Sequence, residues 1–295
     1  MITKQNFKTI DVTDAKRIKE LIDKTASDID ICDNSVGNIY MWMATLDTEI
    51  ALSDSLCVAE HYEGNTFFAL RKNEKDSEDY ILRIKNLIRD FGTPLRLCSM
   101  TNAEITALKN EFGDRFSFEG EDGVADYIYN ADELRDYKGK KFHTQRNHLN
   151  AFKKAYTDYS FLPYKDKSEL ISLLDRYEDG ISEMSASAKK ESLGCRRLID
   201  MLDHLDLDTR ILKIDGEIAG FTVMEKIGDT LMIHIEKAMT KYRGIYPMMV
   251  TLEANAYPDA KYINREEDDG NEGLRRSKRS YNPCTVIQKY LGIIE

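Results

Sequence analysis

Acidic, glycine and basic residues follow one another in the segment from Asn264 to Pro283, near the end of the chain. Glu266 and Glu267 come early in this order, and a carboxylate can take a proton from an amine as the amine attacks an ester or thioester. Neighbouring acids raise one another's pKa, which suits a base that works near neutral pH. The segment therefore predicts a ligand site that contains a general base.

Groups suited to binding anions follow the acids in the same segment. Gly270 and Gly273 can adopt positive φ angles and let the backbone approach a ligand closely. Arg275 and Lys278 are three residues apart, so on a helix they share one face and could together hold the phosphates or the carboxylate of a donor. These four residues are therefore candidates for donor or cofactor binding.

Two more candidates belong to this segment: Asn264 as a substrate contact and Tyr281 as a proton donor to a leaving group. A structural alternative stays open, because runs of charge are usually solvated. In that case Glu267 would pair with Arg275, and the segment would be a salt-linked turn followed by a short helix.

A helix predicted from about Lys140 to Tyr156 is basic, although the chain as a whole is acidic. Its candidate substrate contacts are Lys141, His143, Arg146 and Asn147, as parts of a platform for phosphate or another anion where two domains meet. The alternative is a helix between the domains whose polar groups are bonded to neighbouring backbone.

Two further candidates lie in a strand predicted from Thr230 to Lys237. His234 and Glu236 face the same side of this strand, because side chains alternate along it. If that side is open, His234 is a substrate contact; if it faces the interior, His234 is a satisfied core residue.

The elements that would position these groups repeat along the chain. A helix, three antiparallel strands, a helix and a strand are predicted in the first half and again in the second, and Gly64–Leu70 corresponds to Gly228–His234. We therefore predict an α+β fold of two similar domains, each a mostly antiparallel mixed sheet flanked by helices. The predicted domains are residues 1–130 and residues 131–295, with the active cleft in the second.

Length and composition limit the class of protein. With 295 residues the chain exceeds one typical core, and 42% hydrophobic residues can fill two. The formal net charge of −10 argues against general affinity for nucleic acid or anionic membranes, though not against a local basic patch. The chain has no apolar run of about 18 residues and no signal-peptide pattern, and its five cysteines lack metal-ligand spacing. We therefore expect a cytoplasmic protein with reduced thiols, no transmembrane segment and no metal.

The order of meander, glycine-bearing turn, helix and strand resembles the GNAT (acyl-CoA N-acyltransferase-like) fold. In that fold the loop after the last meander strand holds a pyrophosphate at a helix N-terminus, where unpaired N–H groups and the helix dipole attract anions. The resemblance places Arg243, Gly244 and Tyr246 in this loop as donor-binding residues, although Tyr246 stands where loops for acetyl-CoA prefer a second glycine. It also implies a general base at Glu236.

Two segments, Leu134–Phe152 and Asn264–Pro283, look like those of the phosphatidylglycerol lysyltransferase C-terminal domain family (the DUF2156 type), built from tandem GNAT-like domains. The resemblance covers most of the chain. Members of this class move an aminoacyl group from charged tRNA to a lipid headgroup or a peptide amine. The resemblance therefore implies an aminoacyl-tRNA or acyl-CoA donor, with no other cofactor required.

We expect an acyl- or aminoacyltransferase that acts on an amine or hydroxyl of a small molecule or lipid headgroup, with tRNA or a membrane surface as further partners. The alternative is a non-catalytic GNAT-like module that binds an anionic ligand or a tRNA-like partner. Tyr246 favours the module, and the acid–base segment favours the enzyme.

Overall fold

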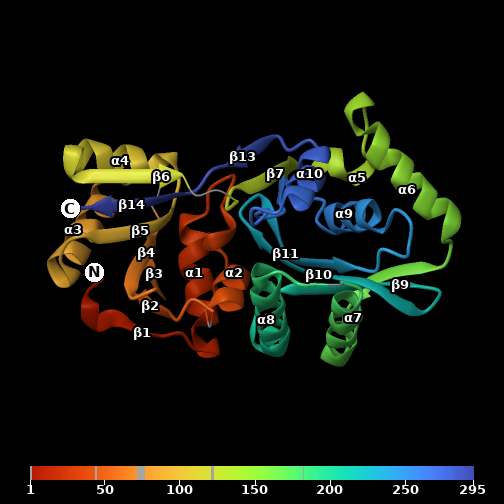
Figure 1. Ribbon diagram of the computed structural model, residues 1–295, viewed down its shortest axis with the longest axis horizontal. Helices are drawn as coiled ribbons and strands as arrows, with labels where there is room; N and C mark the ends of the chain where they lie inside the picture. Colours follow the sequence, from red (N-terminus) through yellow and green to blue (C-terminus); the bar gives the residue numbers. More distant parts are fainter. Residues whose placement is uncertain (1, 44, 72–76, 121–122, 182) are drawn as a thin grey trace.

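Two seven-stranded sheets lie side by side in the computed structural model, with helices between them and on their outer faces (Figure 1). The structure describes residues 2–43, 45–71, 77–120, 123–181 and 183–295. The first sheet contains, in order across it, β1 (Phe7–Thr9), β2 (Thr48–Leu52), β3 (Leu56–Tyr62), β4 (Asn65–Leu70), β5 (Leu95–Met100), β14 (Tyr290–Ile294) and β6 (Phe116–Gly120). The second contains β13 (Thr285–Ile287), β7 (Asp126–Asn130), β12 (Tyr262–Asn264), β11 (Thr230–Ala238), β10 (Glu217–Ile227), β9 (Asp208–Ile214) and β8 (Tyr159–Pro163).

The helices connect and cover these sheets. They are α1 (Ala15–Thr25), α2 (Val36–Trp42), α3 (Ser77–Phe91), α4 (Asn102–Phe112), α5 (Ala131–Asp136), α6 (His143–Ala155), α7 (Lys167–Asp179), α8 (Ala186–Met201), α9 (Ile245–Ala256) and α10 (Glu272–Ser280). Side-chain caps explain where several begin. Ser35 accepts a hydrogen bond from the N–H of Asn38 at the start of α2, and Asn271 accepts two from the first turn of α10.

The two sheets have the same strand order once β14 and β7 are treated as exchanged. The second half of the chain ends in β14, which pairs antiparallel with β5 and β6 of the first sheet. The first half is followed by β7, which pairs antiparallel with β12 and β13 of the second sheet. Each half therefore supplies a strand to the sheet of the other, and the halves cannot separate without breaking main-chain hydrogen bonds in both sheets.

A shared apolar core also joins the halves. Ile18 of α1 and Tyr40 of α2 belong to the same buried cluster as Leu198 of α8 and Phe221 of β10. The opposite face of the second sheet is covered by α9, whose Met248 belongs to a separate buried cluster. In Figure 1, α1 and α2 accordingly lie between the sheets, while α8 and α9 lie on opposite sides of the second sheet.

The predicted α+β fold with two tandem GNAT-like sheets is confirmed, and β4–β5 and β11–β12 form the equivalent parallel pair in each. Strand β7 follows β6 in the chain, but it lies in the second sheet rather than in the first. The domain division predicted after residue 130 therefore differs from sheet membership, which changes between β6 and β7 and changes back at β14. The sequence patterns predict neither α5 nor β13 nor β14.

Two further observations bear on the class of protein. Among the described residues, no helix combines the length and apolar character needed to cross a membrane. All five cysteines are free thiols.

Candidate active site

The parallel strands β11 and β12 pair over only three residues each, ending at Met232 opposite Asn264. The next three residues form what we call the Arg265–Glu267 turn. Within it Glu266 has a φ of 57°, which is uncommon for a residue with a side chain. Its N–H donates to the side-chain oxygen of Asn264 at 2.7 Å. In this conformation the side chains of the three residues reach three different partners.

Glu266 meets His234, so the structure brings together two of the predicted site residues. The Nδ1 atom of His234 lies 2.8 Å from Oε1 of Glu266, and its Nε2 atom lies 3.3 Å from Oε2 of Glu225 on β10. Burial alone lowers the pKa of His234, but the hydrogen bonds and charges of Glu225 and Glu266 outweigh it and raise the pKa to about 9. His234 is therefore a charged interior residue, in keeping with the interior alternative.

This pair also connects the two halves. The same Oε2 atom of Glu225 accepts a hydrogen bond from the N–H of Gly37 in α2 at 3.0 Å. A Cβ atom built on Gly37 would lie only 2.2 Å from Cδ2 of His234. The first turn of α2 is therefore docked against His234 and Glu225 of the second sheet.

Arg265 turns the other way, towards Glu236 on β11. Its Nη2 and Nε atoms lie 2.6 and 3.2 Å from Oε2 of Glu236, and its guanidinium lies 4.7 Å from the ring centre of Tyr281. Glu253 of α9 is fully buried in the same region, and burial, reinforced by the charge of Glu236, holds its pKa well above the usual range. Glu236 is therefore an ion-paired interior group, and Tyr281 is packed under Arg265.

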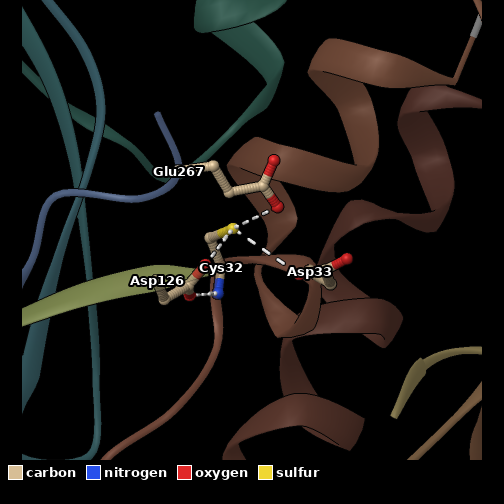
Figure 2. A group of neighbouring side chains, drawn as sticks. All are labelled: Cys32, Asp33, Asp126 and Glu267. Carbon is tan, nitrogen blue, oxygen red and sulfur yellow. Dashed lines mark hydrogen bonds between the residues drawn. The ribbon is translucent and has the colours of Figure 1, made fainter. Parts of the chain in front are cut away.

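Glu267 points into the junction between the halves, where it joins Cys32, Asp33 and Asp126 (Figure 2). One ligand-type atom from each of these four residues lies within 4.8 Å of the others, a spacing that could hold a metal ion. The ammonium of Lys289 contacts all four: it lies 2.5 Å from Asp33, 3.1 Å from Asp126 and 3.4 Å from the Cys32 sulfur, and it also bonds Glu267. A cation belonging to the chain thus lies among three carboxylates, and we call these five residues the junction cluster.

The carboxyls of the junction cluster differ in proton affinity. Burial raises the pKa of Glu267 to about 8, more than the charge of Lys289 lowers it. For Asp33, Lys289 and Ser99 outweigh burial and lower the pKa. The side chain of Glu267 is 29% exposed to solvent, whereas that of Asp126 is fully buried. Glu267 is therefore a partly exposed carboxyl whose pKa lies above that of an ordinary glutamate.

The predicted anion-binding residues of α10 bind groups of the chain itself, in the Arg265–Glu267 turn and at Asp268, which follows it. Lys278 is 7% exposed, and its ammonium donates to the carbonyl oxygens of Arg265, at 2.5 Å, and of Glu267. Arg275 forms a two-pronged pair with Asp268, at 2.8 and 3.0 Å. The salt-linked turn foreseen as an alternative thus exists, but Glu267 pairs with Lys289 rather than with Arg275.

The two glycines of the segment serve the backbone. Gly270 has a φ of 69°. Its backbone nitrogen lies so close to Gly123 that a Cβ atom built on Gly123 would be only 2.4 Å from it. Gly273 lies in the first turn of α10 and donates to the side chain of Asn271 at 2.9 Å. The close approach predicted at Gly270 is therefore made by the chain itself.

The predicted pyrophosphate loop is covered by α6. Gly244 has a φ of 77°, and a Cβ on it would lie 2.2 Å from the carbonyl oxygen of His148. Arg243 is exposed, and Tyr246 lies against Ala238, with its hydroxyl 3.5 Å from that carbonyl. The glycine in this loop thus admits a neighbouring helix, while Arg243 remains open to solvent.

The candidates on the basic helix bind partners that do not belong to the junction cluster. Arg146 donates to the carbonyl oxygens of Tyr137 and Gly139, the latter at 2.9 Å, and Lys141 pairs with Glu133 at 2.7 Å. The exposed His143 and Asn147 bond each other at 3.2 Å. By contrast, Asn264 belongs to the site: its amide donates to Asp126 at 2.6 Å and to the Asp30 carbonyl at 3.0 Å.

Sequence reasoning missed five of the residues that build the site: Cys32, Asp33, Asp126, Lys289 and Glu225. Apart from the adjacent Cys32 and Asp33, they are separated in the chain, and they form no motif with one another. A usable signal existed for Asp126 and Lys289, because each charged residue stands directly at the start of an apolar strand, where burial demands a partner.

Comparison with known proteins gives this geometry a family. A family model described as "Phosphatidylglycerol lysyltransferase, C-terminal" matches residues 25–293. The chain belongs to this family. The resemblance found in the sequence is thereby confirmed, and the family is one named for an aminoacyl transferase.

Individual proteins are similar to this chain in structure or in sequence. A conserved protein of unknown function from Bacteroides thetaiotaomicron has a TM-score of 0.84 and 29% identity, covering 98% of this chain and 99% of that one. L-PGS from Bacillus licheniformis has the same fold, with a TM-score of 0.66 at 13% identity over 100% of this chain and 94% of that one. An uncharacterised protein from Mycoplasmoides gallisepticum is 24% identical over 246 residues, which is 81% of this chain and 77% of that protein.

Proposed function

We propose that this protein transfers an aminoacyl or acyl group from an activated carrier to an amine or hydroxyl acceptor, and that Glu267 exchanges the acceptor's proton. The observation that carries the proposal is the position of Glu267 in the junction cluster. Its side chain is 29% exposed, contacts the ammonium of Lys289 and has a pKa raised to about 8. A carboxyl with these properties is suited to general base catalysis.

The chemistry requires a base because an ammonium group has no lone pair for attack. In the proposed step the acceptor nitrogen or oxygen forms a bond to the carbonyl carbon of the donor ester or thioester. Its proton passes to the carboxylate of Glu267, and the carrier leaves with the electrons of the broken bond. In this scheme Lys289 contacts the carboxylate of Glu267 and Asp126 contacts Lys289, so together they hold Glu267 at the junction.

Membership of a family named for a lysyltransferase favours an aminoacyl carrier over acyl-CoA. The packing of Gly244 against His148 supports the same choice, because a neighbouring helix lies against the loop that binds pyrophosphate in the GNAT fold. Arg243 is exposed and remains our candidate for a contact to the donor's phosphates. The four predicted helix contacts Lys141, His143, Arg146 and Asn147 remain candidates for the carrier as well.

The test uses ¹⁴C-labelled bulk aminoacyl-tRNA and, separately, ¹⁴C-acetyl-CoA, each with vesicles containing phosphatidylglycerol or with a mixture of small amines. We expect label to move to an acceptor with the wild type and to move at least about tenfold more slowly with Glu267→Gln, since general base catalysis contributes about 10²–10⁴-fold. The matched control is Glu119→Gln, which removes an exposed carboxylate from β6 of the first sheet. An equal rate for Glu267→Gln and the control would remove Glu267 from the reaction.

A non-catalytic module that binds an anionic ligand or a tRNA-like partner is the second candidate. The observation that favours it is that the predicted donor clamp is used within the chain: Lys278 binds the Arg265–Glu267 turn, and Arg275 pairs with Asp268. Thermal-shift titrations with aminoacyl-tRNA, coenzyme A and acetyl-CoA at two salt concentrations separate the two functions. A salt-sensitive shift with tRNA, without transfer of label under any condition, would support the module instead of the enzyme.

A further inference from the structure

We propose that Lys278 is the positioning residue of the candidate site: its buried side chain holds the Arg265–Glu267 turn in the conformation in which three successive side chains reach three different partners. The inference rests on the proposed function only in so far as the positioned group Glu267 is the base. Neither the fold nor the family assigns this role to Lys278.

The contacts of the ammonium carry the argument. Lys278 Nζ donates to the carbonyl oxygen of Arg265 at 2.5 Å and to that of Glu267, which are the two residues on either side of Glu266. One point charge therefore spans the central residue of the turn. Both partners are backbone oxygens, so the bond fixes the path of the main chain and leaves the three side chains free for other partners.

The turn needs such an anchor because its conformation is uncommon. Glu266 has a φ of 57°, and a residue with a side chain persists in such a conformation only where its surroundings impose it. If the carbonyls of Arg265 and Glu267 lost their shared donor, Glu266 could return to an extended conformation. The side chain of Glu266 would then leave His234, and that of Glu267 would leave Lys289.

The anchor itself is well fixed. The carbonyl oxygen of Lys278 accepts a hydrogen bond from the hydroxyl of Tyr129 at 2.8 Å, and that of Ser280 accepts one from the side chain of Gln145. At the other end of α10, Asn271 caps the helix. Burial and the nearby charge of Arg265 lower the pKa of Lys278 to about 8, so the chain keeps this lysine inside at a cost, which argues against an incidental contact.

The test measures the pKa of His234 by NMR in protein with ¹³C-labelled histidine, with His234→Gln used to assign the signal. This readout reports whether Glu266 still faces His234, and it needs no substrate. For the wild type we expect a pKa of about 9. For Lys278→Met, a similar unbranched chain without donors, we expect a pKa lower by about one unit or more, because a charged partner at hydrogen-bond distance shifts a pKa by about 1–3 units.

Arg276→Met is the matched control, since Arg276 is an exposed cation on the same helix. It should leave the pKa of His234 unchanged, and Lys278→Arg should restore at least part of the lost shift. A folded Lys278→Met protein with an unchanged His234 pKa would overturn the proposal. If Lys278→Met does not fold, Lys278→Leu, which also lacks donors, provides the same comparison.

The transfer assay adds a second, separable readout. Loss of position should lower kcat by about tenfold or more with little change in KM, because a misplaced reacting group costs rate rather than binding. A wild type that transfers no label defeats the proposed function, while the His234 measurement still decides the role of Lys278. An effect on KM alone, with kcat and the His234 pKa unchanged, would instead make Lys278 a binding residue.

Discussion

Asp126 and Lys289 lie 3.1 Å apart, next to the two strands that are exchanged between the sheets. Asp126 is the first residue of β7, which leaves the first half for the second sheet, and Lys289 directly precedes β14, which returns to the first. Both side chains are buried, and the N–H of Cys32 also donates to Asp126 at 2.6 Å. The candidate site thus lies where the chain passes between the two sheets, and Lys289 joins Asp126 at the start of β7 to Glu267.

Replacing Lys289 by Met should therefore destabilise the whole molecule. The variant leaves Asp33, Asp126 and Glu267 together without their cation, and removing one partner of a buried pair costs about 3–5 kcal/mol. Part of the loss should be recovered on lowering the pH, because protonation removes the repulsion among the carboxyls. Urea unfolding at pH 5 and pH 8 provides the measurement.

The control for this prediction is Lys85→Met, which breaks the exposed pair of Lys85 with Glu111. Surface pairs of this kind contribute about 0–1 kcal/mol. Equal losses in the two lysine variants would contradict the assignment of Lys289 as the cation of a buried cluster.

The stability contributed by His234 should depend on pH in a defined direction. Its pKa is raised from 6.5 to about 9 in the folded protein, so the contribution is complete below about pH 6.5 and is lost as the pH rises through about 9. The shift of about 2.5 units corresponds to a contribution of about 3 kcal/mol. Unfolding free energies of the wild type and His234→Gln should converge over this range, whereas a difference that is independent of pH would show that His234 is neutral in the folded state.

Gly37→Ala should destabilise the protein although alanine favours helices. A Cβ at this position would lie 2.2 Å from the ring of His234, so α2 must shift away from Glu225. We expect a loss of about 1–3 kcal/mol, as for other overpacked sites. In a His234→Ala background the same substitution should cost little or nothing, and a double-mutant cycle without coupling would contradict the contact.

Local elements could be predicted from the sequence because local rules dictate them. Ser35 caps α2 and Thr101 caps α4, and both are residue types that favour helix starts; Gly216, with a φ of 80°, follows Asp215 in a turn of the Asp-Gly type that favours hairpins. The repeated order of strands and helices could also be read, since each repeat carries its own apolar periodicity. The exchange of β7 and β14 could not, because both strands are apolar and compatible with either sheet.

The site was predictable only in part, for a related reason. The segment that holds Glu266 and Glu267 is contiguous, so its mixture of acids, glycines and bases is visible in the chain. Partners such as Lys289 and Cys32 come from distant positions and meet only through the strand exchange. The bases of α10 looked like ligand contacts because sequence spacing gives the helix face of Arg275 and Lys278 but not the inward carbonyls and carboxylate that they bind.

The transfer reaction should gain rate with pH if Glu267 is the base. Its pKa is raised to about 8, and only the ionised carboxylate accepts a proton, so kcat should rise through about pH 8 and then level off. Glu267→Gln should remove this rise along with most of the activity, whereas Glu119→Gln should keep both.

A matched comparison is Asp33→Asn, which changes the junction cluster without touching the base. Because the charge of Asp33 helps to raise the pKa of Glu267, Asp33→Asn should move the rise in kcat to lower pH. A profile that keeps its midpoint in Asp33→Asn, or keeps its rise in Glu267→Gln, would assign the proton transfer to another group.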